Sequence, residues 1–175
     1  MSVKPSSSSN SNLRTPTDLD PKQVKAVAEA INGIVADTFA LYVKTKNFHW
    51  HMSGPHFRDY HLLLDQHGEQ IYASIDPLAE RVRKLGQPTL TSIGAIAKLT
   101  RIKDNDREYV DPEEMLGELI DDNKACIKAM RKAHDICDDA EDVATASLLE
   151  TIIDETERRV WFLFEASRSA DSSGH

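Results

Sequence analysis

Hydrophobic residues recur at steps of three and four along most of the chain, which is the period of an amphipathic α-helix. The first such stretch opens at Asp20-Pro21, a capping residue followed by proline at the first helical position, and runs to about Met52. The turn Ser53-Gly54-Pro55 ends it, and a second helix is expected over about residues 56–85. The apolar stripe of the first helix comprises Val24, Val27, Ile31, Ile34, Val35, Thr38, Leu41, Tyr42, Thr45 and Phe48.

Two further long helices follow a long connection. A second Asp-Pro pair, Asp111-Pro112, opens the third helix with two glutamates in its first turn, and the fourth begins near residues 141–143. A short helix is expected within residues 89–100, and no stretch alternates as a β-strand would. The pattern therefore predicts an all-α, ferritin-like four-helix bundle with a short extra helix between helices two and three.

Pro77 interrupts the pattern because it lies inside the second predicted helix. A proline there removes the hydrogen bond to the carbonyl of Ala73 and should kink the helix. A true break at Asp76 is the competing interpretation. We favour a continuous, kinked helix because the apolar and acidic stripes stay in phase on both sides.

Composition limits the classes of protein that the chain can belong to. Residues 1–19 are rich in serine and asparagine without apolar periodicity, which predicts a disordered tail before one domain over residues 20–168 and a short polar tail over 169–175. A net charge of −8 argues against a surface that coats nucleic acid and suits attraction of cations. Two cysteines that cannot meet within one helix, no secretory signal and no apolar run of membrane-spanning length predict a cytoplasmic protein without a membrane anchor.

One face of the second helix carries acidic and histidine side chains. His61 and Asp65 are four residues apart, as are Asp76 and Glu80, and all four lie within a band about 100° wide. Leucine and isoleucine occupy much of the remaining circumference. The face is therefore typical neither of a core nor of a solvated surface.

The spacing of these two pairs indicates a site between two chains. Asp65 and Asp76 are roughly 16 Å apart along the helix axis, too far for one metal ion to bind both. The pairs are symmetric about the midpoint between Gln70 and Ile71, so two antiparallel copies of the helix would set the first pair of one chain against the second pair of the other. Chance placement of surface charges is the competing interpretation.

Three residues near this midpoint lie on or beside the same face. We expect Gly68 to let two copies of the helix cross closely, and Glu69 and Tyr72 to be interface residues.

The segment HWHMSGPHFRDYHLLLDQHGEQIYASIDPLAERVRKLG resembles the signature of Dps-type mini-ferritins, the DNA-protecting proteins of starved cells. The segment Asp142–Glu165 resembles the last helix of that family, so the resemblance covers about residues 20–168. The matching residues in the first segment are His49-Trp50, Gly54, Phe57, His61, Asp65, Asp76, Glu80 and Leu85-Gly86. The family's iron-oxidising centre lies between subunits, which implies ligands from two chains: His49, His61 and Asp65 from one, and Asp76 and Glu80 from its two-fold mate.

The resemblance also implies a function. It implies Fe(II) oxidation, preferentially by hydrogen peroxide, with ferric oxide stored in a hollow shell of twelve subunits. Histidine and carboxylates with open positions suit iron that must bind, react and leave. Trp50 is implied to lie near the centre and intercept stray oxidising equivalents, packing at a helix end being the alternative. His51, His56, His67 and His134 are expected to have surface or packing roles.

Acidic residues crowd the turn between helices three and four, and a solvated loop is the usual explanation for such a run. In the family this turn lines pores on three-fold axes, which implies an iron-entry pore. Ser147 stands where related sequences often carry an aspartate, which puts the narrow end of that channel in question. The acidic residues of the turn are Asp135 and the four implied pore residues Asp138, Asp139, Glu141 and Asp142.

Two other functions compete with a ferroxidase. A conventional ferritin centre inside one bundle needs Glu-x-x-His pairs, and no glutamate here is followed three residues later by histidine. A nucleoid-packing protein with a weak, structural or zinc-bound metal site is the second alternative, but all the matched ligand types are present. The tail offers Lys4 and Arg14, too few bases to predict DNA binding, although repetition on a shell leaves DNA contact and nucleoid association open.

Overall fold

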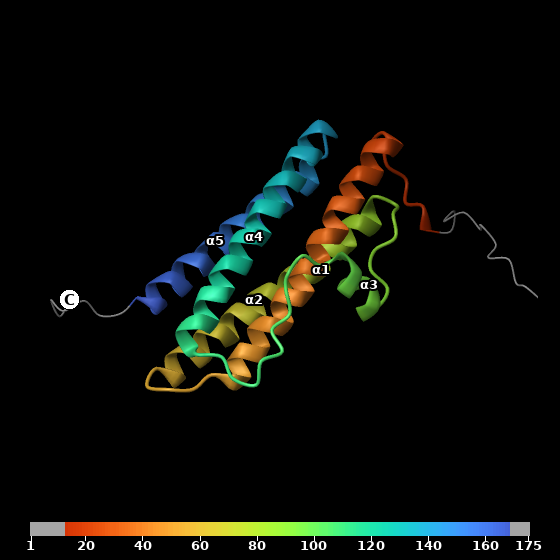
Figure 1. Cartoon of the computed structure of the whole chain (residues 1–175). Coiled ribbons are helices and arrows are strands. Elements are labelled where there is room, and N and C mark those ends of the chain that lie inside the picture. The colour runs from red at the N-terminus through yellow and green to blue at the C-terminus, as the bar shows by residue number, and fades with distance from the viewer. Residues whose placement is uncertain (1–12, 169–175) are drawn as a thin grey trace, which may run out of the picture.

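The computed structural model describes residues 13–168, which form five α-helices and, within that range, no β-strand. Four long helices make an antiparallel bundle, and a short helix lies beside the first in the long connection (Figure 1). The predicted all-α architecture and extra helix are confirmed. The helices are α1 (Pro21–His51), α2 (Phe57–Lys84), α3 (Ile93–Leu99), α4 (Pro112–Asp139) and α5 (Val143–Ser167).

Both predicted Asp-Pro starts cap a helix as expected. The Asp20 carboxylate accepts hydrogen bonds from the backbone N–H groups of Lys22 (2.8 Å) and Gln23 (3.3 Å). Asp111 accepts one from the backbone N–H of Glu113 at 3.0 Å. Each cap satisfies a donor that has no partner within the helix, so the sequence fixes where α1 and α4 begin.

Pro77 lies inside a continuous α2, so the competing prediction of a break at Asp76 is wrong. Ile75 and Leu78, on either side of the proline, are both buried in the core. Their packing holds the two halves of α2 in one helix despite the hydrogen bond that proline removes.

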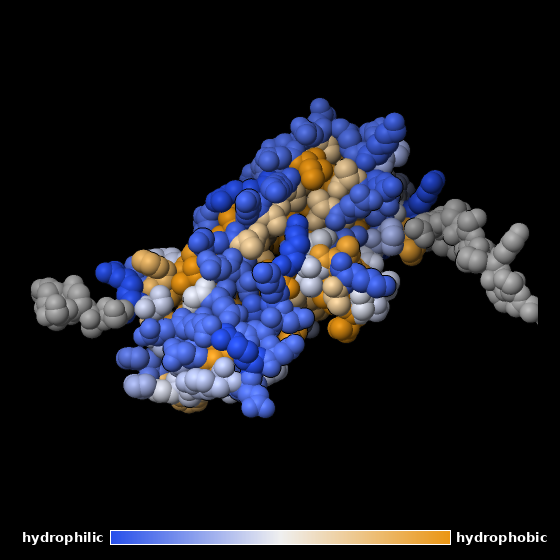
Figure 2. Space-filling view, viewed as in Figure 1, coloured by the Kyte–Doolittle hydropathy of each residue, from blue (hydrophilic) through white to orange (hydrophobic). Residues whose placement is uncertain are grey.

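The core lies between the long helices, where α1 contacts α2 and α4, and α5 contacts α4 and α2. By length and composition α1 could cross a membrane, so the expectation that no run is long and apolar enough does not hold for this helix. Its apolar stripe, however, from Val24 to Phe48, is buried in the bundle. The face of the molecule in Figure 2 is mainly hydrophilic, with apolar residues gathered between the helical ridges.

The chain before α1 lies against the end of α2. Thr15 Oγ1 donates a hydrogen bond to the Arg83 carbonyl (2.9 Å), and the Arg83 guanidinium donates one to the Leu13 carbonyl (2.8 Å). Gly86 has a φ of +74°, and a Cβ there would lie 2.9 Å from backbone atoms of Thr15. Residues 13–19 are therefore placed by specific contacts, which corrects the predicted extent of the tail; residues 1–12 and 169–175 lie outside the described residues.

Candidate metal centre

Two histidines from neighbouring helices meet beside the turn that joins α1 to α2. The turn is possible because Gly54 adopts a φ of +94°, which L side chains rarely adopt. It folds the last turn of α1 onto the first turn of α2, so the rings of His49 and His61 stack with centroids 3.8 Å apart. The prediction that these two side chains lie together is confirmed.

The backbone fixes which nitrogen of each ring is free. Nδ1 of His49 lies 2.9 Å from the carbonyl oxygen of His61, and Nδ1 of His61 lies 2.9 Å from the carbonyl oxygen of His49. A carbonyl oxygen can only accept a hydrogen bond, so each Nδ1 carries the proton. In the neutral ring, each Nε2 then presents its lone pair, which is the form of histidine that binds a metal ion.

Asp65 is the third side chain of this group. Its Oδ1 lies 3.7 Å from Nε2 of His49, and the carboxylate is 43% exposed. The Lys46 ammonium donates a hydrogen bond to the same Oδ1 at 2.6 Å. This bond lowers the pKa of the Asp65 carboxyl, with smaller contributions from the charges of Lys46 and the nearby histidines. The carboxylate is thus held in its charged form.

Asp76 and Glu80, the other two predicted ligands, are exposed further along α2, and Glu80 lies 3.6 Å from Lys84. Eleven residues of helix separate Asp65 from Asp76, so one chain cannot close these five side chains around one ion. Among residues 13–168, no group of three or more histidine, cysteine or acidic side chains is arranged to hold a metal ion. That a second copy of the chain supplies Asp76 and Glu80 to the centre remains a prediction.

Gly68 does not have the predicted role at a crossing between two copies of α2. It is buried, and a Cβ there would lie 3.0 Å from Cδ of Lys46 and 3.9 Å from the ring of Tyr42. The missing side chain therefore makes room for α1 of the same chain. The sequence could not show this, because helical periodicity does not say which neighbour a small residue faces.

The surroundings of the centre are partly apolar and exposed. Trp50 is 64% exposed, so the alternative of core packing is wrong within the single chain. Tyr72, expected at an interface, is 60% exposed and its ring lies 5.3 Å from that of Tyr42. His51 and His56 are both exposed, in agreement with surface roles.

His134 lies away from the candidate centre, near the opposite end of the bundle. It is partly buried, with Nε2 3.1 Å from Glu150 and Nδ1 3.2 Å from Asp138. His134 therefore joins α4 to α5 through its contact with Glu150.

His67 is buried at 5% exposure on the inner side of α2. Burial, together with the positive charges of Arg159 and Arg158, lowers its pKa to about 4 from 6.5. The folded protein therefore holds this histidine neutral, whereas the unfolded chain takes up a proton below about pH 6.5.

Acid should therefore destabilise the protein through His67. As pH falls from 7 to 4, His67 is protonated in the unfolded state but remains largely neutral in the folded state. We therefore expect the free energy of unfolding to fall by about 3 kcal/mol. Replacing His67 with glutamine should flatten this dependence in thermal unfolding at pH 7, 5.5 and 4. An equal acid dependence in His67→Gln and in the control His51→Gln, at an exposed position, would contradict the assignment.

The acidic turn between α4 and α5 divides into exposed and buried carboxylates. Asp138, Asp139 and Glu141 are exposed, as a vestibule would require. Asp142 is only 3% exposed, and its oxygens accept hydrogen bonds from Arg81 (2.7 Å) and from the backbone N–H of Thr145 (3.1 Å). The prediction that Asp142 lines an iron-entry pore is therefore wrong, because the carboxylate is buried and caps α5.

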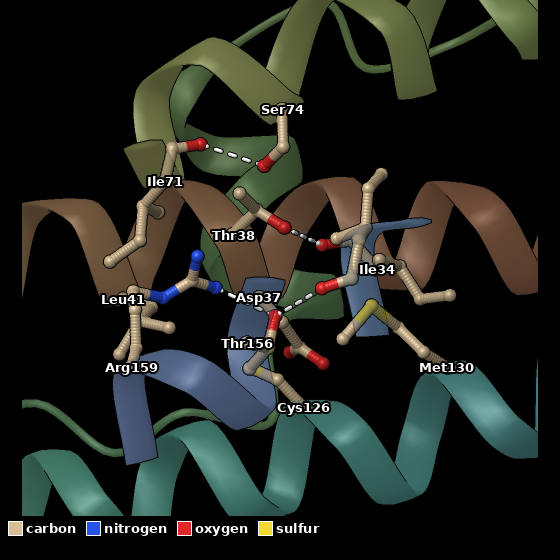
Figure 3. Close-up of a pocket in the computed structure, with 11 residues that line it drawn as sticks. Ile34, Asp37, Thr38, Leu41, Ile71, Ser74, Cys126, Met130, Thr156 and Arg159 are labelled. Carbon is tan, nitrogen blue, oxygen red and sulfur yellow. Dashed lines mark hydrogen bonds between the residues drawn. The ribbon is translucent and has the colours of Figure 1, made fainter. Parts of the chain in front are cut away.

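Among the residues that the structure describes, the centre of the bundle offers no iron site. A cavity of about 10 Å³ lies there, and the guanidinium of Arg159 donates a hydrogen bond to Thr156 beside it (2.7 Å; Figure 3). Arg159 is 4% exposed and also donates to Asn123 (3.1 Å). Burial lowers the pKa of Arg159 to about 10, so it stays charged at neutral pH. Asp37 lines the same cavity, but its carboxylate accepts hydrogen bonds from Arg101. A fixed cation and a single, already paired carboxylate exclude a conventional ferritin centre.

Comparison with known proteins agrees with this geometry. The ferritin-like domain family matches residues 28–167. The "DNA protection during starvation protein" of Brevibacillus brevis is 33% identical over 137 residues, covering 78% of this chain and 91% of that protein. A low temperature-induced protein of Nostoc is 33% identical over 146 residues, 83% of this chain and 82% of that one. The solved structure of DpsC from Streptomyces coelicolor is similar with a TM-score of 0.86 at 26% identity, covering 90% of this chain and 92% of that one.

The chain belongs to the ferritin-like family. Within it, the bundle, the short helix in the long connection and the curated relatives define a Dps-type mini-ferritin. The relatives of Brevibacillus brevis and Deinococcus radiodurans are named DNA protection during starvation proteins, and the Vibrio cholerae relative is described as a member of a superfamily of ferritin-like diiron-carboxylate proteins.

Proposed function

We propose that the protein is a ferroxidase that oxidises Fe(II), preferably with hydrogen peroxide, at centres shared between two subunits. The observation that carries this proposal is the stacked pair His49 and His61, whose Nδ1 atoms are engaged by backbone carbonyls, with Nε2 of His49 3.7 Å from Asp65. Imidazole and carboxylate ligands suit iron that must be released after reaction. Asp76 and Glu80 of a second copy complete the ligand set.

Each group has a role in this reaction. The two imidazoles and Asp65 bind the Fe(II) substrate, and the second copy's carboxylates balance its charge. Two Fe(II) ions give one electron each to hydrogen peroxide, which takes up two protons and leaves as water. Trp50, which is exposed and follows His49 in the chain, would give an electron to a stray oxidant.

The product is ferric oxide, which we propose is stored inside a hollow shell of twelve subunits in the cytoplasm. Asp138, Asp139 and Glu141 of the acidic turn would attract Fe(II) to an entry pore. Consumption of Fe(II) and peroxide together removes the reactants that generate hydroxyl radicals. This chemistry would protect DNA without any contact with it.

The proposal is tested by loading the assembled protein with Fe(II) under anaerobic conditions and then adding peroxide. Rapid formation of ferric absorbance in the wild type, slowed at least about a hundredfold in His61→Ala, is the expected result because a lost ligand should cost more than the 10–100-fold typical of outer-shell changes. Equal rates in the two proteins would overturn it.

A separate measurement addresses contact with DNA. The net charge of −8 opposes binding to a polyanion, so we expect no shift of DNA in a gel at physiological salt. A shift at that salt concentration, combined with slow iron oxidation, would favour the nucleoid-packing alternative.

A further inference from the structure

A lysine side chain contacts the candidate ligand Asp65. Lys46 Nζ lies 2.6 Å from Asp65 Oδ1, closer than His49 Nε2, which lies 3.7 Å from the same atom. A divalent cation bound by His49 and Asp65 would need the region that this ammonium occupies. Two positive ions cannot share that oxygen without strong repulsion.

The lysine is built into this position. Lys46 lies three residues before His49 on α1, so both side chains project from the same face. Its side chain is only 18% exposed, whereas the surface lysines Lys25 and Lys84 are 72% and 61% exposed. The stem packs over Gly68, where even a methyl group would lie 3.0 Å from Cδ.

We propose that Lys46 is a built-in competing cation that sets how tightly the centre holds iron. It is a positioning residue: it neutralises and orients Asp65 while the centre is empty, and it must swing away when Fe(II) binds. The ligands consequently bind Fe(II) more weakly than the same ligands would without the lysine. The lysine also helps to displace the ferric product. The inference rests on the proposed function, because it concerns the same site.

Removal of the charge gives the direct test. In Lys46→Met, anaerobic titration with Fe(II), and with Co(II) as a redox-inert probe, should show a dissociation constant about ten- to a hundredfold lower than in the wild type. Steady-state oxidation should show a lower KM together with a lower kcat, because product is retained. A structural role alone would not move KM and kcat in this way.

Three further variants sharpen the result. Lys46→Arg keeps the charge and should bind metal as weakly as the wild type. Gly68→Ala crowds the lysine stem without touching a candidate ligand, so it should shift affinity in the same direction as Lys46→Met by a smaller factor. Lys25→Met, which removes an exposed lysine paired with Glu29, should change nothing.

Each outcome decides between the two proposals. Equal or weaker metal binding in a folded Lys46→Met, judged by circular dichroism, would overturn the role of Lys46 while leaving the ferroxidase in place. Failure of both the wild type and Lys46→Met to bind Fe(II) or Co(II) would overturn the ferroxidase centre itself, and the role of Lys46 with it.

Discussion

Co-assembly of a His61→Ala chain with a Glu80→Ala chain should restore the Fe(II) oxidation that each variant lacks alone. The structure places His61 beside His49 near the α1–α2 turn and leaves Glu80 exposed towards the other end of α2. With the proposed pairing, the intact histidine half of one chain would meet the intact carboxylate half of the other in a mixed dimer. The second centre of that dimer contains both substitutions and stays inactive.

The fraction of intact centres in the mixture gives the oxidation rate that should be recovered. Random mixing of equal amounts gives mixed dimers in about half of the pairs, and one of the two centres in each is intact, so about a quarter of the wild-type rate should return. The two chains must be co-expressed, or unfolded and refolded together, so that subunits exchange. The measurement is the initial rate of ferric absorbance after peroxide is added to anaerobic Fe(II)-loaded protein.

A matched mixture controls for general effects of co-assembly. His49→Ala and His61→Ala both damage the histidine half, so their mixture contains no intact centre and should stay inactive. Recovery in that control, or no recovery with Glu80→Ala, would contradict a centre divided between chains in this way.

Replacing Asp142 with alanine should destabilise the protein by about 3 kcal/mol, because it removes the cap of α5 and leaves Arg81 without its buried partner. Arg81 donates to both Asp142 and Thr145 at 2.7 Å, so this carboxylate joins the end of α2 to the start of α5. The thermal midpoint should fall by about 10 °C.

Asp139→Ala is the matched control, since Asp139 is an exposed acid in the same turn. Loss of its side chain should change stability by less than about 0.5 kcal/mol. If Asp142→Ala unfolded at the same temperature as Asp139→Ala, the carboxylate would not be structural, and its place in the proposed entry pore would be open again.

The sequence predicted the helices well because their ends are set locally. Asp20 and Asp111 cap helices through backbone groups two or three residues away, a distance that a sequence pattern can show. The pairing of His49 with His61 followed from the family resemblance and from a turn of known length. These features depend on residues that are near one another in the chain.

What the sequence could not show depends on contacts between distant residues. In the sequence, Asp142 is one of several neighbouring acidic residues. Its carboxylate is buried against Arg81, which lies 61 residues away in the chain. Lys46 reads as an ordinary surface base, and only its stem over Gly68 and its bond to Asp65 reveal its position. Residue type and helical phase carry no information about such partners.

The arginine at the bundle centre has a consequence for how the protein is made. Many small metalloproteins fold only once their ion arrives, because the ion holds the core together. Here Arg159 already supplies the positive charge of the interior, bonded to Asn123 and Thr156. The hydrogen bonds of Arg159 are thus complete without a metal ion, and we expect the subunit to fold in a cell that is short of iron.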